Sequence, residues 1–292
     1  MAKVMPNRAP RMRGREGNRA LHALAFVFLA ILALVELLPF LWMFLSGFKS
    51  TREMLLDPFA MPEVWKIENY LTAWRSGVSR YFVNSIFTTI AATVLCVAVS
   101  SMLAYPLARF RFRLNRVLLM FVLSGMMLAP MVSLIPLYKI LSFLGLYDTR
   151  LALIIPYVAF RIPFSTFLIW SHFVTIPREI EEAAIIDGCS SLRVLLQVML
   201  PLSKPMLATT ALLCARYVWN EMMFALCFIE TTAIKTIPVG LLALKGQESG
   251  EWSVLVAGLA LSTIPIVILY LIFQKQLVRG MMMGFLQRQQ CG

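Results

Sequence analysis

Long apolar stretches alternate with shorter polar segments along most of the chain. Each stretch supplies about 20 residues, and at a helical rise of about 1.5 Å per residue this length crosses a hydrocarbon layer about 30 Å thick. The pattern therefore predicts an all-α integral membrane protein with six transmembrane helices. The expected spans are residues 21–45, 82–107, 118–140, 153–174, 206–229 and 253–273.

The composition agrees with a membrane protein, since 60% of the residues are hydrophobic and only 14% are charged. A net charge of +12 on a soluble fold would suggest a nucleic-acid partner. Here the basic residues gather in particular segments between the apolar stretches, so we expect them to orient the chain in a membrane and expect no nucleic acid. The scattered cysteines and the two unpaired histidines predict no disulfide framework, no metal site and no cofactor.

The N-terminal region divides into three expected segments. Residues 1–20 carry six Lys or Arg residues against Glu16 alone, which indicates a disordered cytoplasmic leader. The stretch 21–45 is too long for the core of a signal peptide and lacks a convincing cleavage site, so we interpret it as an uncleaved first transmembrane helix. Residues 46–80 are nearly balanced in charge and contain several aromatic residues, as an external loop would.

The later connectors predict the orientation of the chain. Four arginines crowd the link between spans two and three, whereas the link near 145–150 is almost neutral. The segment 175–205 follows span four, and the tail 274–292 follows span six with further basic residues. Because basic connectors stay on the cytoplasmic side, both termini and the segment 175–205 are expected in the cytoplasm.

The segment 175–205 is the most distinctive polar interruption of the apolar pattern. Pro177 suits the first turn of a helix, and the glutamates that follow lie at the end whose partial positive charge favours carboxylates. Gly188 can take the left-handed conformation that ends a helix. Ser190 or Ser191 can then cap a second short helix. That second helix would lie along the membrane interface with one apolar face made of Leu192, Leu195, Leu196 and Met199.

The same segment carries a family motif. The residues Glu182-Ala183-Ala184, then Gly188, then Val198-Met199-Leu200-Pro201 resemble the EAA motif of ATP-binding-cassette (ABC) importer permeases, which usually have Ile at position 198. The resemblance implies a type I ABC importer permease fold in which this segment is a cytoplasmic coupling helix that docks on an ATPase subunit. An interfacial connector without a partner is the alternative. The implied ATPase-coupling residues are Glu181, Glu182, Ala183, Ala184, Asp187, Gly188, Leu200 and Pro201.

Further motifs extend the resemblance over about residues 81–284. They are Asn84-Ser85, Ala104-Tyr105, Leu134-Ile135-Pro136-Leu137-Tyr138, Trp219-Asn220-Glu221 and Phe273-Gln274-Lys275 followed by Gly280. Together these motifs resemble those of carbohydrate-importer permeases. Within that group they match best the second permease subunit of maltose-type systems. The expected type-1 transmembrane core is 81–273, whereas the tail 274–292 departs from the glycine-rich terminus that is frequent in the family.

The resemblance also implies partners and a location. It implies a plasma (inner) membrane subunit that pairs with a second homologous permease, two ABC ATPase subunits and an extracytoplasmic sugar-binding protein. ATP hydrolysis is expected on the partner subunits, because no G-x-x-x-x-G-K-[ST] sequence occurs in this chain. The chain itself is therefore expected to be no enzyme.

Four polar residues in or near the apolar stretches are candidates for the translocation path: Arg161, Arg216, Asn220 and Glu221. Charged groups at such positions usually face a cavity or a partner helix. A position near a membrane interface is the alternative for Arg216 and Glu221. The alternative function is a self-contained secondary transporter or channel, which would more often show acidic or histidine relays and broken helices in paired positions. An intramembrane enzyme would need paired carboxylates, a nucleophile–base pair or metal ligands, and none stands out.

Overall fold

The structure is a computed structural model that describes residues 15–245 and 252–290, with side chains over 21–244 and 252–274. Most of the expected leader, residues 246–251 and the last two residues lie outside the described residues. Within the described ranges the chain forms helices and no strand. The fold is therefore all-α, as the sequence predicts.

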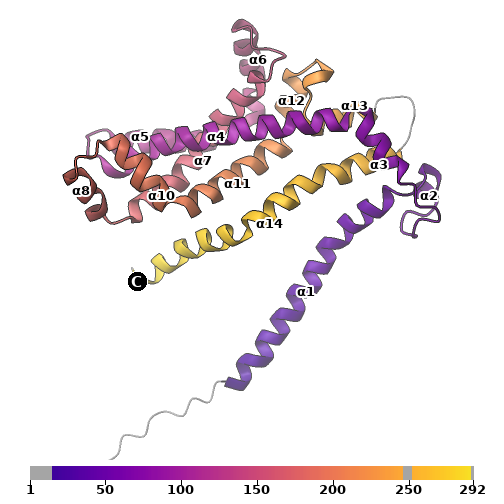
Figure 1. The fold of residues 1–292 in the computed structure, drawn as a ribbon, viewed down its shortest axis with the longest axis horizontal. Helices are drawn as coiled ribbons and strands as arrows, with labels where there is room; N and C mark the ends of the chain where they lie inside the picture. Colours follow the sequence, from indigo (N-terminus) through magenta and orange to yellow (C-terminus); the bar gives the residue numbers. More distant parts are fainter. Residues whose placement is uncertain (1–14, 246–251, 291–292) are drawn as a thin grey trace, which may run out of the picture.

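The helices follow one another with short connectors (Figure 1). In chain order they are α1 (Arg15–Ser46), α2 (Thr51–Leu56), α3 (Glu68–Ala73), η1 (Trp74–Val78), α4 (Ser79–Arg109), α5 (Asn115–Ser124), η2 (Gly125–Met127), η3 (Pro130–Ser133), α6 (Leu134–Phe143), α7 (Leu151–Thr175), α8 (Arg178–Ile186), α9 (Ser191–Val194), η4 (Leu195–Met199), α10 (Leu200–Leu202), α11 (Lys204–Asn220), α12 (Met223–Phe228), η5 (Thr232–Ile234), α13 (Ile237–Lys245) and α14 (Trp252–Gln290).

Four continuous helical stretches are long and apolar enough to cross a membrane, and two bent helix pairs pass the same test together. The continuous stretches are Leu21–Ser46, Glu68–Arg109, Leu151–Thr175 and Trp252–Gln274. The bent pairs are Asn115–Met127 with Pro130–Phe143, at 91°, and Ser191–Leu202 with Lys204–Asn220, at 83°. By length and composition the described residues therefore contain four spans, or six if each bent pair counts as one.

Two of the expected spans are not continuous helices. In the stretch 118–140, Ala129 is extended and Pro130 begins a new 3-10 turn, because a residue before proline disfavours the helical conformation. In the stretch 206–229, α11 ends at Asn220 and Glu221 is extended before α12 begins. Neither stretch therefore forms one continuous helix.

The expected external loop 46–80 is largely folded. Ser50 and Glu53 form a reciprocal capping box at the start of α2, which satisfies two backbone N–H groups at once. The buried Lys49 donates from Nζ to the carbonyl oxygens of Asp57, at 3.1 Å, and Pro58, at 2.9 Å. These contacts stabilise the turn that leads from α1 into the bundle.

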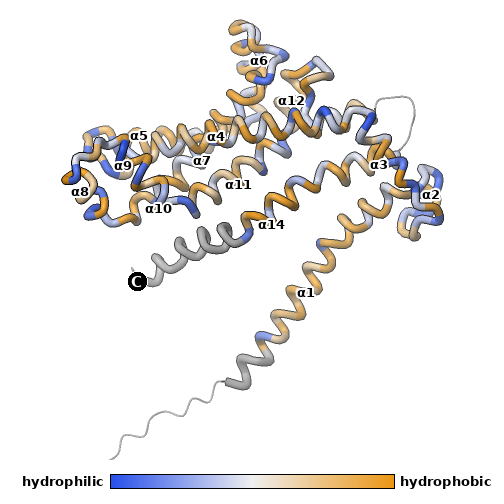
Figure 2. Tube along the Cα trace, viewed as in Figure 1, coloured by the Kyte–Doolittle hydropathy of each residue, from blue (hydrophilic) through white to orange (hydrophobic). Residues whose placement is uncertain are grey.

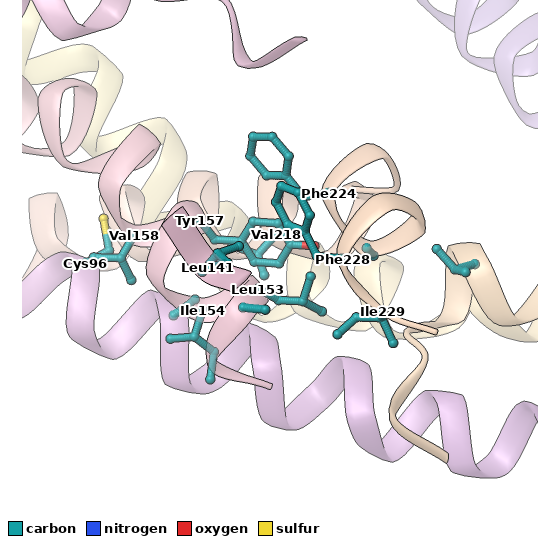
Figure 3. Close-up of a cluster of buried hydrophobic side chains, with 14 of the residues drawn as sticks. Cys96, Leu141, Leu153, Ile154, Tyr157, Val158, Val218, Phe224, Phe228 and Ile229 are labelled. Atoms are coloured by element: carbon teal, nitrogen blue, oxygen red, sulfur yellow. The ribbon is translucent and has the colours of Figure 1, made fainter. Parts of the chain in front are cut away.

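The helix bundle is built around α4 and α7, which pack along each other, with α11 against both. A central apolar cluster joins them to α6 and α12 through residues such as Leu153, Tyr157 and Phe224 (Figure 3). A second cluster lies where α4 and α7 meet α8, α9 and η4, and a third lies where α3, α13 and α14 meet. The core therefore runs the length of the bundle and holds α8 against its end.

Helix α1 lies apart from this bundle (Figure 1). Its apolar window has none of its residues buried, although its C-terminal part contacts α14. Figure 2 shows that α1 and the described part of α14 are mostly hydrophobic, whereas hydrophilic residues gather around α8, α9 and α2. An apolar helix this exposed must contact lipid or another protein.

Candidate functional site

The structure confirms the expected pair of short helices in the segment 175–205. Pro177 is extended and α8 begins directly after it, with glutamates in its first turn. Gly188 ends the helix with φ +82°, and its N–H donates to the carbonyl of Ile185 at 2.9 Å. Of the two candidate caps, Ser190 is the one used, since its hydroxyl accepts a hydrogen bond from the backbone N–H of Arg193.

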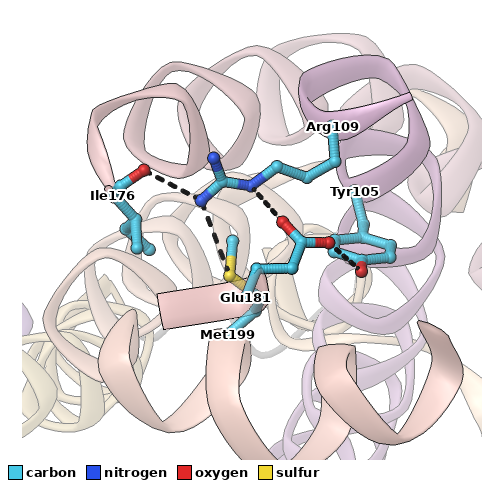
Figure 4. Close-up of polar contacts among 5 residues, drawn as sticks. All are labelled: Tyr105, Arg109, Ile176, Glu181 and Met199. Atoms are coloured by element: carbon cyan, nitrogen blue, oxygen red, sulfur yellow. Dashed lines mark hydrogen bonds and ion pairs between the residues drawn. The ribbon is translucent and has the colours of Figure 1, made fainter. Parts of the chain in front are cut away.

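Glu181 lies on the inner face of α8 and is the hub of a buried polar cluster (Figure 4). Its Oε2 forms an ion pair with Nε of Arg109 at 3.0 Å, and its Oε1 accepts a hydrogen bond from the Tyr105 hydroxyl at 2.5 Å. Arg109 Nη2 also donates to the carbonyl oxygen of Ile176 at 3.0 Å and contacts the sulfur of Met199 at 3.8 Å. We call these five residues the Arg109 joint.

The Arg109 joint ties four segments of the chain together, α4, the connector after α7, α8 and η4. The two charged side chains are only 4% and 9% exposed, so each depends on the other for charge balance. Tyr105 and Arg109 come from the last turns of α4, Ile176 from the connector after α7, and Met199 from η4. A displacement of α8 away from the bundle would break the ion pair, so α8 and the end of α4 are expected to move together.

The outer face of α8 has a different character. Glu182, Ala183 and Asp187 are exposed, and the neighbouring Ile186 is 85% exposed. Ala184 and Leu200 pack instead against the apolar cluster beneath α8, while Pro201 is exposed on α10. The eight predicted coupling residues are therefore divided between an inner face that attaches α8 and an outer face that is open.

The second short helix differs from the expectation. Leu195 and Met199 are buried in the bundle, whereas Leu192 and Leu196 are more than half exposed. The chain here passes through the π-helical turn η4, which breaks the 3.6-residue period on which the prediction depended. Leu192, Leu195 and Leu196 nevertheless line one apolar groove, whereas Met199 is buried beneath it, so three of the four residues share an apolar face as expected.

Two of the translocation-path candidates line a cavity. Arg216 and Asn220 lie at the end of α11 beside a cavity of about 650 Å³, and the Asn220 amide donates to the carbonyl oxygen of Arg216 at 2.8 Å. The remaining lining comes mainly from α13 and α14 and includes Ser262 and Thr263. This is a mostly apolar space with a few polar groups, as small-molecule sites usually are.

The other two candidates lie elsewhere. The Arg161 guanidinium stacks over the rings of Phe164, at 4.8 Å, and Tyr217, at 5.0 Å. Glu221 accepts hydrogen bonds from the Tyr157 hydroxyl at 2.7 Å and from the backbone N–H of Phe224 at 2.9 Å. The carboxylate of Glu221 therefore stabilises the start of α12 at the break in the span. Among the described residues, no group of three or more His, Cys, Asp or Glu side chains could hold a metal.

Sequence reasoning missed the partners of Glu181. Arg109 was counted only among the arginines that orient the chain, although Tyr105 and Arg109 stand four residues apart on one helix face. Their position at the end of a span, next to a glutamate-rich connector, is the signal that could have revealed the joint.

The fold and the site define a class of protein: a multi-pass all-α membrane protein that carries a pair of short helices, α8 and α9, at one end of its bundle. Residues 97–283 match the family of binding-protein-dependent transport system inner membrane components. The chain belongs to this family. It is a multi-pass permease subunit of a binding-protein-dependent importer, as the resemblance implied.

Individual relatives cover nearly the whole chain. The probable ABC transporter permease protein YurM of Bacillus subtilis is 44% identical over 259 residues, which cover 89% of this chain and 86% of the relative. The trehalose/maltose transport system permease protein MalG of Thermococcus litoralis is 36% identical, over 88% of this chain and 94% of the relative. The diacetylchitobiose uptake system permease protein NgcG of Streptomyces coelicolor is 31% identical, over 91% of this chain and 89% of the relative.

A solved structure agrees with the fold. A chain of a bacterial ABC transporter that is involved in the import of the acidic polysaccharide alginate matches with a TM-score of 0.76 and 27% identity. The match covers 90% of this chain and 98% of that chain. A second chain, from the alginate transporter in complex with its pentasaccharide-bound periplasmic protein, shares the fold at a TM-score of 0.60 and 13% identity.

Proposed function

We propose that this permease moves a sugar or oligosaccharide into the cell and that α8 is the coupling helix on which an ABC ATPase subunit docks. The proposal of a sugar substrate is supported by the relatives, which include a trehalose/maltose transport permease and a diacetylchitobiose uptake permease. ATP binding and hydrolysis would occur on two ATPase subunits, and an extracytoplasmic binding protein would deliver the sugar.

The observation that carries the docking proposal is the outer face of α8. Ile186 is 85% exposed beside Asp187 and Glu182, at the end of a helix that lies outside the candidate spans. An exposed apolar side chain surrounded by polar groups is typical of a site where another protein binds. The Arg109 joint on the inner face would then pass a displacement of α8 to the end of α4.

Substitution of Ile186 tests this docking. Ile186→Ser should weaken retention of the ATPase subunits on purification of the complex and should abolish sugar uptake, with unchanged membrane insertion. The control is Leu144→Ser, which removes another exposed apolar side chain (58% exposed) from the connector between α6 and α7. Full ATPase retention by Ile186→Ser would contradict the proposal that the ATPase docks on α8. It would not affect the assignment of the chain to its family.

A second permease subunit is the natural partner for the exposed membrane surface. A groove of about 570 Å³ between α4 and α11 is lined almost entirely by apolar side chains, among them Val94, Ala98 and Leu207. The exposed helix α1 adds a further unpartnered surface. The chain without a second permease should therefore neither remain monodisperse in detergent nor move sugar into liposomes, and transport by the purified chain alone would contradict the heterodimer.

The proposed orientation places both termini and α8 in the cytoplasm. It rests on the arginine-rich connector between α4 and α5 and on the near-neutral connector before α7. Ser76 and Ser191 are exposed on opposite sides of the proposed membrane. In a cysteine-free background, Ser76→Cys should react with an impermeant thiol reagent in intact cells, whereas Ser191→Cys should react only after the cells are permeabilised. The reverse pattern would invert the topology.

The cavity beside Arg216 and Asn220 is proposed as part of the translocation path. Arg161 and Glu221 were proposed for the same path from the sequence, but their side chains are engaged with aromatic rings and with the start of α12. Asn220→Ala should therefore change the KM for sugar more than Arg161→Gln does, since Asn220 lines the cavity and Arg161 does not.

A further inference from the structure

A basic groove lies where α4 ends and α5 begins, at the end of the bundle that carries α8 (Figure 1). Its volume is about 570 Å³, and its charged lining consists of Arg111, Arg113 and Arg116. The indole of Trp170 and the side chain of Leu119 form apolar walls. We call this feature the arginine groove.

The connector that carries these arginines is held in a fixed conformation. The Asn115 amide donates to the carbonyl oxygens of Leu107, at 3.2 Å, and Phe110, at 2.9 Å. The indole N–H of Trp170 donates to the same Leu107 carbonyl at 3.3 Å. Arg109 is directed away, into the joint with Glu181, and fixes the start of the connector. The groove is therefore shaped by hydrogen bonds rather than by the arginines themselves.

The positive charge of the groove has little compensation within the chain. No carboxylate lines the groove, and among the side chains of 21–244 and 252–274 no ion pair involves Arg111, Arg113 or Arg116. The terminal segments are themselves basic: Glu16 is the single acidic residue of 1–20, and 275–292 contains none. Three guanidinium groups around one groove favour an anion with several oxygen atoms, such as a phosphate.

The surface that continues from the groove along α5 is apolar. Val117, Met120 and Phe121 are 60%, 56% and 74% exposed, and α5 belongs to one of the bent pairs that can count as a span. A ligand that matches the whole surface combines a phosphate group with hydrocarbon chains. Basic pockets at the membrane face of transmembrane helices bind anionic lipid headgroups in this way.

We propose that the arginine groove binds the headgroup of an anionic phospholipid, such as phosphatidylglycerol or cardiolipin, with the acyl chains along the exposed face of α5. This site goes beyond the transport function and does not depend on which subunits dock on α8. A bound lipid would hold the connector between α4 and α5 next to the Arg109 joint.

The test measures lipid binding to the purified full-length chain, with the partner subunits that copurify, by native mass spectrometry. Phosphatidylglycerol should bind more tightly than phosphatidylcholine. The triple variant Arg111→Gln, Arg113→Gln, Arg116→Gln should raise the apparent Kd for phosphatidylglycerol on the order of a hundredfold, since each basic residue near an anionic surface contributes about fivefold. The matched control, Arg52→Gln, Arg75→Gln, Arg80→Gln, removes the same charge from exposed positions elsewhere and should leave the Kd unchanged.

A second variant separates a shaped site from diffuse positive charge. Asn115→Ala keeps every arginine, and therefore also the basic charge that orients the chain in the membrane. It removes the two hydrogen bonds from the Asn115 amide that hold the connector between α4 and α5. It should weaken phosphatidylglycerol binding severalfold. An unchanged Kd in Asn115→Ala, or an equal loss in both triple variants, would overturn the proposal of a built site.

Two further outcomes would replace the lipid with another ligand. Complete competition by inorganic phosphate at concentrations equal to that of the lipid would show a site for free phosphate instead. Loss of an ATPase subunit from the groove triple variant, with phosphatidylglycerol binding unchanged, would show that the groove is a protein interface.

Discussion

Two polar clusters hold connectors of this bundle, and they differ in exposure. The Arg109 joint attaches α8 to the end of α4 through an ion pair whose side chains are 4% and 9% exposed. The second cluster attaches the α6–α7 connector to the segment after α12. The Asp148 carboxylate accepts hydrogen bonds from the backbone N–H groups of Glu230, at 2.9 Å, and Thr231, at 3.0 Å. The Tyr147 hydroxyl donates to the Glu230 carboxylate at 2.8 Å. All contacts of this Asp148 clasp are exposed to solvent.

The comparison indicates where the molecule is rigid. An exposed polar contact exchanges hydrogen bonds with water at little cost, so the Asp148 clasp can open and close readily. A buried charge cannot lose its partner without a large penalty, so the Arg109 joint keeps α8 and α4 together through any conformational change. The end of the bundle that carries the proposed docking helix is therefore expected to move as a unit.

The largest effect is expected from a break in the Arg109 joint. Arg109→Met leaves the Glu181 carboxylate buried without its counter-charge, which costs about 3–5 kcal/mol in buried ion pairs generally. We expect a strong fall in the thermal stability of the purified chain and complete loss of uptake. Thermal unfolding followed by tryptophan fluorescence and transport in whole cells measure the two effects.

A double variant separates stability from transmission. Arg109→Met with Glu181→Leu removes both charges and should recover much of the lost stability, because an apolar pair leaves no buried charge. Uptake should stay lost if the ion pair transmits the displacement of α8. Recovery of uptake together with stability would mean that the joint only stabilises the fold.

A smaller effect is expected at Gly188, where α8 ends. A residue with a Cβ atom at φ +82° is strained by roughly 1–2 kcal/mol, although no neighbouring atom lies within 4 Å of the Cβ position. Gly188→Val should therefore loosen ATPase retention and reduce uptake, with normal membrane insertion. Gly188→Asn is the control, because asparagine tolerates the left-handed conformation. Equal sugar uptake and equal ATPase retention in Gly188→Val and Gly188→Asn would show that backbone strain at this position does not affect coupling.

Glu182→Ala should reduce ATPase retention and uptake less than Arg109→Met or Gly188→Val does. Glu182 is exposed on the outer face of α8, and an exposed charge contributes only tenths to about one kcal/mol. We expect a partial fall in ATPase retention that high salt reproduces in the wild-type complex. Its neighbour Glu181 gives the contrast: Glu181→Ala should destabilise the chain itself, since that side chain is buried. Similar thermal stability of the two variants would contradict the division of α8 into two faces.

The sequence predicted features that depend on local pattern. The apolar stretches locate the long helices, and Pro177, Gly188 and Ser190 mark the ends of α8 and α9 because capping depends on residues close in the chain. The motif at Glu182 identified the family, which the relatives confirm.

Features that depend on tertiary contacts were not predictable in this way. The helix α11 ends before Glu221, whose carboxylate accepts a hydrogen bond from Tyr157, far away in sequence, and no proline or glycine marks the break. Glu181 points into the bundle because it pairs there with Arg109 on α4, whereas the neighbouring Glu182 is exposed on the outer face of α8. A run of glutamates in the sequence does not reveal which one is buried, because the answer lies on another helix.

The smallest effect is expected at the Asp148 clasp, and it should depend on pH. The hydrogen bond from the Thr231 hydroxyl lowers the pKa of Asp148 below its ordinary value, so the folded protein favours the carboxylate more than the unfolded chain does. The resulting stability is fully present at neutral pH and is lost as the pH falls below about 4, through the lowered pKa of the folded state. Because Asp148 is only partly buried and its hydrogen bonds lie at the surface, Asp148→Asn should cost a few tenths of a kcal/mol at neutral pH. The difference in thermal stability between wild type and variant, measured from pH 7 to pH 3, should shrink as the pH falls. A difference that grows on acidification, or one as large as that of Arg109→Met, would contradict the contrast between an adaptable and a rigid attachment.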